Sequence, residues 1–487
     1  MAKNKARPPV VVVLGHVDHG KTTLLDYIRR SHIAEKEYGA ITQSIGAYEI
    51  ELPVKGYPTN KITFIDTPGH AAFSKLRERG ANVADIAILV IDAKESVKPQ
   101  TEESIEHIKK AGIPFIAALN KIDLPDANPQ KVMRDLQRFN VLVEDMGGDV
   151  VALPISAKTG QGVQDLLEAV LLLSSEMEIR FSPDNPLTAF IIETKKDKRG
   201  IVVSIVIKDG RIRISDTIYS SETQARVRAM FDDLGQSVQE AEASKPLEIL
   251  GFEEFPKVGD IISTKKDVVR KHQRNIQSSA SKAPFDIEAI FGENDKVKKL
   301  QVILKADTHG SLEAISSALS GNSRLEVLSQ DVGDITKSDV FMARSAKAII
   351  LGFNIKASHD ALQVAKDLKI IIRTYRLIYE LLDEVEEVID LLEQKEFEEK
   401  VKGKLKILAQ FIIDGQKIFG GKVVKGKISL GDKVLVKRGD MLLGESKIAS
   451  LKIRARSVEE VKAGQECGIL LQPVLDLKPS DMIESIL

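Results

Sequence analysis

One octapeptide, Gly15-His-Val-Asp-His-Gly-Lys-Thr22, constrains the fold of this chain more than any other feature. It follows a β-branched run at residues 10–14 and precedes an expected helix that begins near Thr22. Glycine at both ends lets the backbone curl so that successive N–H groups face a phosphate, and the helix N-terminus adds positive dipole. This strand–loop–helix order predicts a phosphate-binding loop of the G-x-x-x-x-G-K-[ST] type. The residues expected to bind nucleotide here are Gly15, His16, Val17, Asp18, His19, Gly20, Lys21, Thr22 and Thr23.

The polar side chains around this loop predict the chemistry of a nucleoside triphosphate with Mg²⁺. Lys21 is expected to reach the β- and γ-phosphates, and the hydroxyl of Thr22 is expected to bind Mg²⁺. Asp66-Thr-Pro-Gly69 ends a second expected strand, at residues 62–65. There Asp66 can hold the Mg²⁺ shell, and the N–H of Gly69 can detect a γ-phosphate.

Two further motifs identify the base. Asn120-Lys121-Ile122-Asp123 follows an expected strand at 115–119, and Ser156-Ala157-Lys158 follows one at 150–155. One carboxylate, that of Asp123, can accept both N1–H and N2–H of guanine, a pair of donors that adenine lacks, which favours GTP over ATP. A backbone N–H of the Ser156–Lys158 turn can meet the guanine O6. All these motifs lie at carboxyl ends of strands, the edge where open α/β sheets bind ligands.

Two residues near the expected γ-phosphate have alternative interpretations. Thr42, in the glycine-flanked segment 35–46, is either an Mg²⁺ ligand of a loop that orders around the nucleotide or a loop threonine with no metal role. His70 stands where many small GTPases have a glutamine that orients the attacking water, so we assign it that catalytic role over that of a surface histidine. A zinc site formed with His16 and His19 is disfavoured because no fourth ligand is evident.

The average charge of the chain hides an uneven distribution. Seventy Lys and Arg against 71 Asp and Glu give 487 residues a net charge of −1, which taken alone argues against a nucleic-acid partner. Residues 401–487, however, hold 16 basic and 10 acidic side chains, so they carry +6 and the rest of the chain carries −7. No apolar run approaches the ~20 residues of a membrane span, and a single cysteine excludes a disulfide framework. We therefore expect a cytoplasmic protein with no membrane partner.

The order of strand and helix patterns along the sequence predicts a multidomain α/β and β protein. Strand and helix patterns alternate first, short alternating strands follow, a second α/β pattern leads into a carboxylate-rich helix, and the strand texture then returns. The expected parts are a P-loop GTPase domain (1–180), an antiparallel β-barrel (181–270), a charged linker with an α/β sandwich domain (271–380), a linking helix (381–400) and a C-terminal β-barrel (401–487).

The two expected barrels share a weak repeat. Residues 426–435 resemble residues 210–219, and the pattern at 468–483 resembles that at 247–262. We interpret this as two barrels of one kind. The alternative is that small barrels converge on such turns.

Taken together, the motifs Gly15–Thr22, Gly39-Ala-Ile-Thr-Gln43, Asp66–His70 and Asn120–Asp123 resemble those of the translational GTPases. Segments 45–48, 70–73, 302–314, 349–354 and 466–468 narrow the resemblance to the bacterial initiation factor two family, without the long N-terminal extension that many members carry. The resemblance covers the whole chain. It implies GTP and GDP as ligands, hydrolysis stimulated by the ribosome, and a monomer off the ribosome.

The resemblance also implies partners: the small and large ribosomal subunits and initiator formylmethionyl-tRNA. The factor would bring this tRNA to the small subunit and promote subunit joining. The C-terminal barrel would hold the tRNA through Lys452, Arg454, Glu466, Cys467 and Gly468.

The chain departs from the family pattern at several positions. Ile453 replaces an expected arginine, Arg454 an aromatic residue and Gly421 a cysteine, while Ala40 replaces a glycine and Asp334 a small residue. The first three bear on formyl-group selectivity. They motivate an alternative function, a GTP-dependent RNA-binding or ribosome-assembly module without initiator-tRNA selectivity.

Overall fold

The computed structural model describes residues 4–29, 46–54, 56–270, 299–413, 416–439, 441–454 and 456–486. The chain forms two compact units, which divide between Asp383 and Glu384. None of the described helices is both long and apolar enough to cross a membrane. Most of the expected charged linker (266–296), Thr42 and most of segment 35–46 lie outside the described residues.

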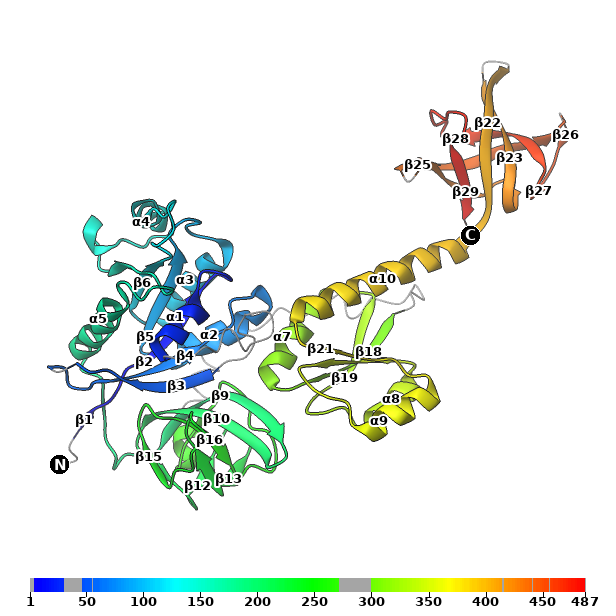
Figure 1. Ribbon diagram of the computed structural model, residues 1–487. Helices are drawn as coiled ribbons and strands as arrows, with labels where there is room; N and C mark the ends of the chain where they lie inside the picture. The colour runs from blue at the N-terminus through cyan, green and yellow to red at the C-terminus, as the bar shows by residue number, and fades with distance from the viewer. Residues whose placement is uncertain are drawn as a thin grey trace. The chain divides into compact units, whose positions relative to one another are not determined.

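The N-terminal part of the first unit is a six-stranded sheet in the order β3-β4-β2-β5-β6-β7, in which β3 alone is antiparallel to its neighbour. Helices cover both faces (Figure 1), so every residue of β2 and β5 is buried, as expected for a parallel sheet between helices. The strands are β2 (Val10–Gly15), β3 (Gly46–Glu51), β4 (Lys61–Asp66), β5 (Ile86–Asp92), β6 (Phe115–Asn120) and β7 (Ala152–Pro154). The helices are α1 (Lys21–Arg29), α2 (Ser74–Val83), α3 (Pro99–Ala111), α4 (Pro129–Gln137) and α5 (Val163–Glu176).

An antiparallel β-barrel domain follows. Its main sheet has the order β14-β16-β10-β9-β17, and the pairs β11-β15 and β12-β13 complete it. Residues 224–231 form two strands, because β13 pairs with β12 whereas β14 pairs with β16. The strands are β9 (Thr188–Asp197), β10 (Gly200–Asp209), β11 (Arg211–Arg213), β12 (Thr217–Tyr219), β13 (Gln224–Arg226), β14 (Ala229–Phe231), β15 (Glu240–Glu242), β16 (Pro246–Leu250) and β17 (Ile261–Ile262).

The second α/β part has a four-stranded parallel sheet in the order β19-β18-β20-β21. Its strands are β18 (Leu300–Ala306), β19 (Leu325–Val332), β20 (Ile349–Phe353) and β21 (Ile372–Tyr375). Its helices are α7 (His309–Leu319), α8 (Lys337–Ala346) and α9 (His359–Leu368), and α10 (Ile378–Lys400) follows as one continuous helix.

The sequence pattern did not predict helices α2 and α8. Helix α2 buries Leu76 and Val83 but also the charged Arg77, so its sequence lacks a clean apolar stripe. Helix α8 buries only Val340 and Ala343, and a capping box between Thr336 and Asp339 defines its start. Contacts with neighbouring elements stabilise both helices, and neither sequence has the regular apolar pattern that would have predicted a helix.

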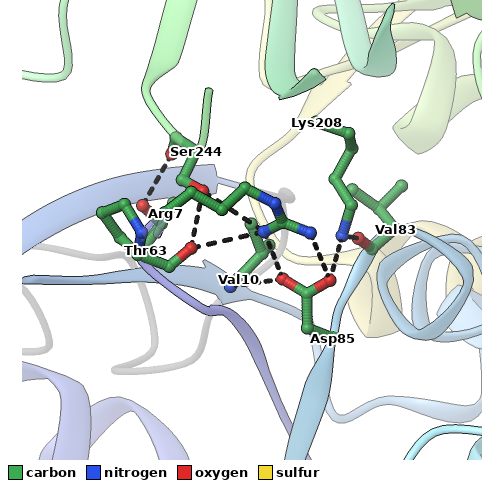
Figure 2. A network of polar contacts seen from close by, with 8 residues as sticks. Arg7, Val10, Thr63, Val83, Asp85, Lys208 and Ser244 are labelled. Carbon is green, nitrogen blue, oxygen red and sulfur yellow. Dashed lines mark hydrogen bonds and ion pairs between the residues drawn. The ribbon is translucent and has the colours of Figure 1, made fainter. Parts of the chain in front are cut away.

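A buried ion-pair network joins the first sheet to the barrel, as Figure 2 shows. Asp85, just before β5, accepts two hydrogen bonds from the Arg7 guanidinium at 2.6 and 2.8 Å and one from Lys208 of β10 at 2.5 Å. Burial alone would raise the pKa of Asp85, but the two cations hold it below its ordinary value. Burial lowers the pKa of Lys208 to about 8. Ser244 extends the network, since its carbonyl accepts the Thr63 hydroxyl at 2.6 Å.

A second buried carboxylate lies where the barrel meets the second α/β part. Glu193 of β9 is 4% exposed and accepts the N–H of Gly310, at the start of α7, at 3.1 Å. Helix α2 reaches the same helix α7 through Arg79, which pairs with Glu313 at 3.0 Å. Burial raises the pKa of Glu193 to about 7, against the opposing effects of the Thr194 N–H and the Arg79 charge.

The second unit is a closed β-barrel. Its strands follow the order β22-β29-β24-β25-β28-β23, and β23 pairs back with β22, so no open edge remains among these six strands. Strands β26 and β27 pair at its side with β25 and β23. The strands are β22 (Val401–Ile413), β23 (Gln416–Ser429), β24 (Lys433–Arg438), β25 (Met441–Ile453), β26 (Arg456–Ser457), β27 (Glu460–Lys462), β28 (Glu466–Gln472) and β29 (Met482–Ile486).

The matching segments of the two barrels form similar turns. Asp216 and Asp432 each accept a backbone N–H three residues upstream, at 2.8 and 2.9 Å, and each follows a residue with φ of +76° or +88°. The second pair of matching segments also agrees. Gly259 and Ser480 have φ of +89° and +81°, and each donates its N–H at 2.9 Å to a long strand of its own barrel.

We predict that Asp85→Asn destabilises the first unit strongly. The change leaves Arg7 and Lys208 buried beside a neutral amide, which costs about 3–5 kcal/mol in comparable buried pairs. Urea unfolding measures the loss. Asp126→Asn is the matched control: its pair with Lys94 is exposed, so it should cost under about 1 kcal/mol. Equal effects of the two substitutions would contradict a structural role for the network.

We also predict that Glu193 makes the stability of the first unit depend on pH. The folded state keeps a proton on this carboxyl between pH 4.5 and 7 that the unfolded chain releases, so the free energy of unfolding falls as pH rises through this window. Glu193→Gln should remove the fall and gain up to about 3 kcal/mol over wild type between pH 5 and 8. Chemical unfolding across that range tests it, with the exposed Glu253→Gln as control. Parallel pH profiles for wild type and Glu193→Gln would refute the assignment.

Candidate functional site

The loop between β2 and α1 has the geometry of a phosphate cradle. Gly15 and Gly20 have φ of +142° and +90°, and a Cβ at either position would collide with the Val90 carbonyl oxygen or the Asn120 amide. Asp18 also lies in the left-handed region, with φ of +62°. Only glycine fits at the two ends because neighbouring chain approaches them closely.

Lys21 supplies a buried positive charge at this loop. Its ammonium donates to the carbonyl oxygens of Gly15 at 2.9 Å and His16 at 2.6 Å, and its side chain is 6% exposed. Burial lowers its pKa to about 8, although the charge of Asp66 opposes the shift. A buried ammonium that is hydrogen-bonded to two neutral carbonyls favours an anionic ligand beside it.

The Asp66–Gly69 turn lies against the same loop. A Cβ on Gly69 would collide with the Lys21 ammonium and come within 3.1 Å of the Val17 N–H nitrogen. Thr67 fixes the turn by donating its hydroxyl to the Val13 carbonyl at 2.8 Å. The backbone of Gly69 therefore faces the position that a terminal phosphate beside Lys21 would take. These residues fit a triphosphate with Mg²⁺, for which Thr22 and Asp66 would be the ligands or their supports.

Asn120 joins the base-reading motifs to the phosphate loop. Its amide nitrogen donates to the His19 carbonyl at 2.8 Å, and its amide oxygen accepts the Ala157 N–H at 2.9 Å. Ser156 donates its hydroxyl to one oxygen of Asp123 at 2.7 Å. The structure thus brings all four sequence motifs to one sheet edge. Within this set Asn120 acts as a brace between loops.

Three supporting residues escaped the sequence-based prediction. Asp92, at the end of β5, pairs with Lys121 at 2.7 Å and thereby holds that lysine in a left-handed backbone with φ of +64°. Gln100 accepts the Val17 N–H at 2.9 Å. The fully buried Arg77 donates to the carbonyl of His70 at 2.6 Å and pairs with Glu103 at 2.7 Å. No sequence motif marks these three residues, because each of them acts through a tertiary contact.

His70 is half-buried and neutral in this arrangement. Burial and the charge of Arg77 lower its pKa below 6.5. Its Nδ1 accepts the Ala72 N–H at 3.1 Å, so the neutral ring carries its proton on Nε2 and can donate from there. Burial lowers the pKa of His19 to about 3 as well. Among the described residues, no group of three or more His, Cys, Asp and Glu side chains is placed to hold a metal ion by itself.

Of the residues expected to contact tRNA, Lys452 lies on β25, Arg454 follows the end of β25, and Glu466, Cys467 and Gly468 lie on β28. Lys452 is opposite Gly468, and Gly468 is opposite Gly420 of β23, where a Cβ would come within 3.1 Å of the exposed ring of Phe411. We call these four residues the glycine trough. It faces outward.

Neighbouring side chains of β28 lie on opposite faces of the strand. Glu466 is exposed opposite Lys422, whereas Cys467 is 6% exposed and packs in the barrel core opposite Gly421. Burial raises the pKa of the Cys467 thiol to about 11, which disfavours the reactive thiolate at neutral pH.

Comparison with known proteins places the chain in a family. Residues 7–175 match the Elongation factor Tu GTP binding domain, residues 186–265 match Elongation factor G domain 2, and residues 276–386 match Translation-initiation factor 2. A Thermus thermophilus protein described as Translation initiation factor IF-2 is 41% identical over 497 residues, which cover 98% of this chain and 86% of that protein. The chain belongs to the translation initiation factor IF-2 family.

Other relatives in this family are longer. The Aquifex aeolicus IF-2 is also 41% identical, and the match covers 98% of this chain but 61% of that protein. For the Moorella thermoacetica IF-2 the covered share is 54%. Among solved structures, GDP-bound aIF5B from Aeropyrum pernix matches 99% of this chain and 92% of its own, at 28% identity and a TM-score of 0.48.

Proposed function

We propose that this chain is a GTP-hydrolysing initiation factor that recruits initiator formylmethionyl-tRNA to the small ribosomal subunit and promotes subunit joining. The observation that carries the proposal is the pair of hydrogen bonds made by Asn120, which lock the phosphate loop and the base-reading turn into one site. Membership of the IF-2 family supports the partners. We further propose that it works in the cytoplasm as a monomer off the ribosome.

In this proposal the chain binds GTP or GDP through residues on three loops. The N–H groups of 15–23 surround the phosphates, Lys21 neutralises the β- and γ-phosphates, and Asp123 accepts the two guanine N–H groups. Lys121, with Ser156, Ala157 and Lys158, completes the base side. Mg²⁺, when bound through Thr22, Thr42 and the carboxylate of Asp66, would offset phosphate charge.

His70 is proposed as the catalytic residue that orients the attacking water. Its Nε2–H can hold a water oxygen while the Gly69 N–H contacts the γ-phosphate. Arg77 keeps both residues in one turn through its bonds to the Pro68 and His70 carbonyls at 3.1 and 2.6 Å. Hydrolysis removes the γ-phosphate contact of Gly69, so the turn can relax and release the factor.

For the tRNA, we propose that the acceptor end binds at the glycine trough. Several basic side chains of this barrel are already neutralised, since Lys404 and Lys437 pair with Glu484 and Arg438 pairs with Asp481. Lys452 of the trough, with Arg454 and Lys422 nearby, has no ion pair within the described part of the barrel, nor do the other two, so all three are available to phosphates. Glu466 and the backbone of Cys467 and Gly468 form its wall.

Ribosome dependence tests the proposed function. The purified chain should hydrolyse GTP slowly alone and much faster with ribosomes, because His70 needs an external surface to set its position. His70→Ala should lower the stimulated rate by about 10²- to 10⁴-fold and leave GDP affinity unchanged. Equal rates with and without ribosomes would contradict the proposal.

Base recognition gives a second prediction. Asp123→Asn removes the acceptor for two guanine N–H groups, and each charge-assisted bond is worth about 1.5–3 kcal/mol. GTP affinity should fall about 100-fold or more, and xanthosine triphosphate, whose O2 can accept from the new amide, should bind better than GTP. Asp126→Asn, exposed on the same loop, is the control. Unchanged GTP affinity would rule out Asp123 as the base reader.

The second candidate function rests on Ile453 and Arg454. Ile453 packs partly into the barrel core, and Arg454 is exposed with φ of +45°. If these changes remove initiator selectivity, the chain would bind formylated and unformylated methionyl-tRNA equally well. A clear preference for the formylated form, lost in Gly468→Val because the new side chain fills the trough, would support the initiator role.

A further inference from the structure

A tyrosine from outside the GTPase sheet packs on the proposed catalytic histidine. Tyr379 lies in the first turn of α10, and its ring centroid is 4.3 Å from that of His70, with the two rings nearly perpendicular at 85°. Ile378 and Leu381, its neighbours on this helix, are fully buried, so this end of α10 is firmly anchored. The contact is closer than the one His70 makes with Phe73 of its own turn, at 6.1 Å.

The other contacts of His70 hold the same orientation. The Ala72 N–H binds Nδ1, and Arg77 binds the carbonyl of His70. In the described part of the chain, no hydrogen bond joins the imidazole to the phosphate loop. Tyr379 nevertheless lies close enough to that loop for the charge of Asp18, after burial, to raise the pKa of its phenol. The tyrosine therefore lies at the phosphate end of the site.

We propose that Tyr379 is a positioning residue that holds the His70 imidazole in a resting orientation and thereby restrains GTP hydrolysis. The inference rests on the proposed GTPase function and adds a residue from α10 to that site. In this proposal the imidazole turns away from the tyrosine ring to face a water beside the γ-phosphate. The free energy of an aromatic pair with this geometry is large enough to favour the resting orientation several-fold over the other one. The phenol hydroxyl is not required, since the ring supplies the contact.

The test compares ring removal with ring retention. Tyr379→Ala should raise the ribosome-free kcat for GTP by about 2- to 10-fold, from the strength of one aromatic pair, with KM unchanged. Tyr379→Phe should keep the wild-type rate. Phe341→Ala is the matched control, because it removes an exposed aromatic ring from a helix of the same unit. An unchanged or lower rate in Tyr379→Ala would overturn the proposal.

A second readout does not depend on activity. The pKa of the His70 imidazole, measured by NMR titration and assigned with His70→Gln, should lie below 6.5 in wild type and rise in Tyr379→Ala as the ring loses cover. A merely structural role for Tyr379 would lower the unfolding temperature without moving this pKa, and that result would also overturn the proposal. Failure of ribosomes to stimulate wild type would instead refute the proposed function, while the titration still reports on the contact.

Discussion

The candidate site depends on one side chain, the amide of Asn120. Its two hydrogen bonds, to the His19 carbonyl and from the Ala157 N–H, bind three loops that lie far apart in sequence. An amide is suited to this position because it donates and accepts at once, whereas a carboxylate could only accept. The brace also explains Gly20, since any side chain there would displace the amide. The phosphate-loop motif and the Asn120–Asp123 and Ser156–Lys158 motifs are thus parts of one connected arrangement.

The two buried carboxylates at the junctions of the first unit have different surroundings. Asp85 is matched by two cations within 2.8 Å, so it stays ionised and fixes the barrel against the first sheet. Glu193 has no ion pair among the described residues, and burial raises its pKa to about 7. The ion-paired Asp85 favours a fixed contact between the barrel and the first sheet. Glu193, in contrast, is a protonatable group beside α7. Helix α7 also contacts α2 through Glu313, so the helix after the Asp66–His70 turn is connected to the second α/β part.

Similar barrels serve different surroundings in the two units. Their turns share an aspartate that accepts an upstream N–H and a left-handed residue beside it. The first barrel uses Lys208 and Glu193 to pack against neighbours. In the second barrel Lys404 and Lys437 both pair with Glu484, so part of its positive charge is neutralised internally. The net charge of +6 in this region therefore overstates the number of cations free of internal ion pairs.

The sequence by itself determined the phosphate loop, the positions of the Asn120–Asp123 and Ser156–Lys158 motifs and the order of strand and helix, because these depend on local backbone chemistry and short spacing. It also predicted the similar turns of the two barrels, which need specific residues. It missed α2, Arg77, Asp92 and Tyr379, because each is stabilised by tertiary contacts and has no periodic or motif signal. It missed α8 as well, although the capping box of Thr336 and Asp339 is a local signal for the start of that helix. The tertiary structure alone decided that Cys467 faces the core while Gly468 faces outward, since adjacent strand positions alternate and only strand pairing fixes which side is buried.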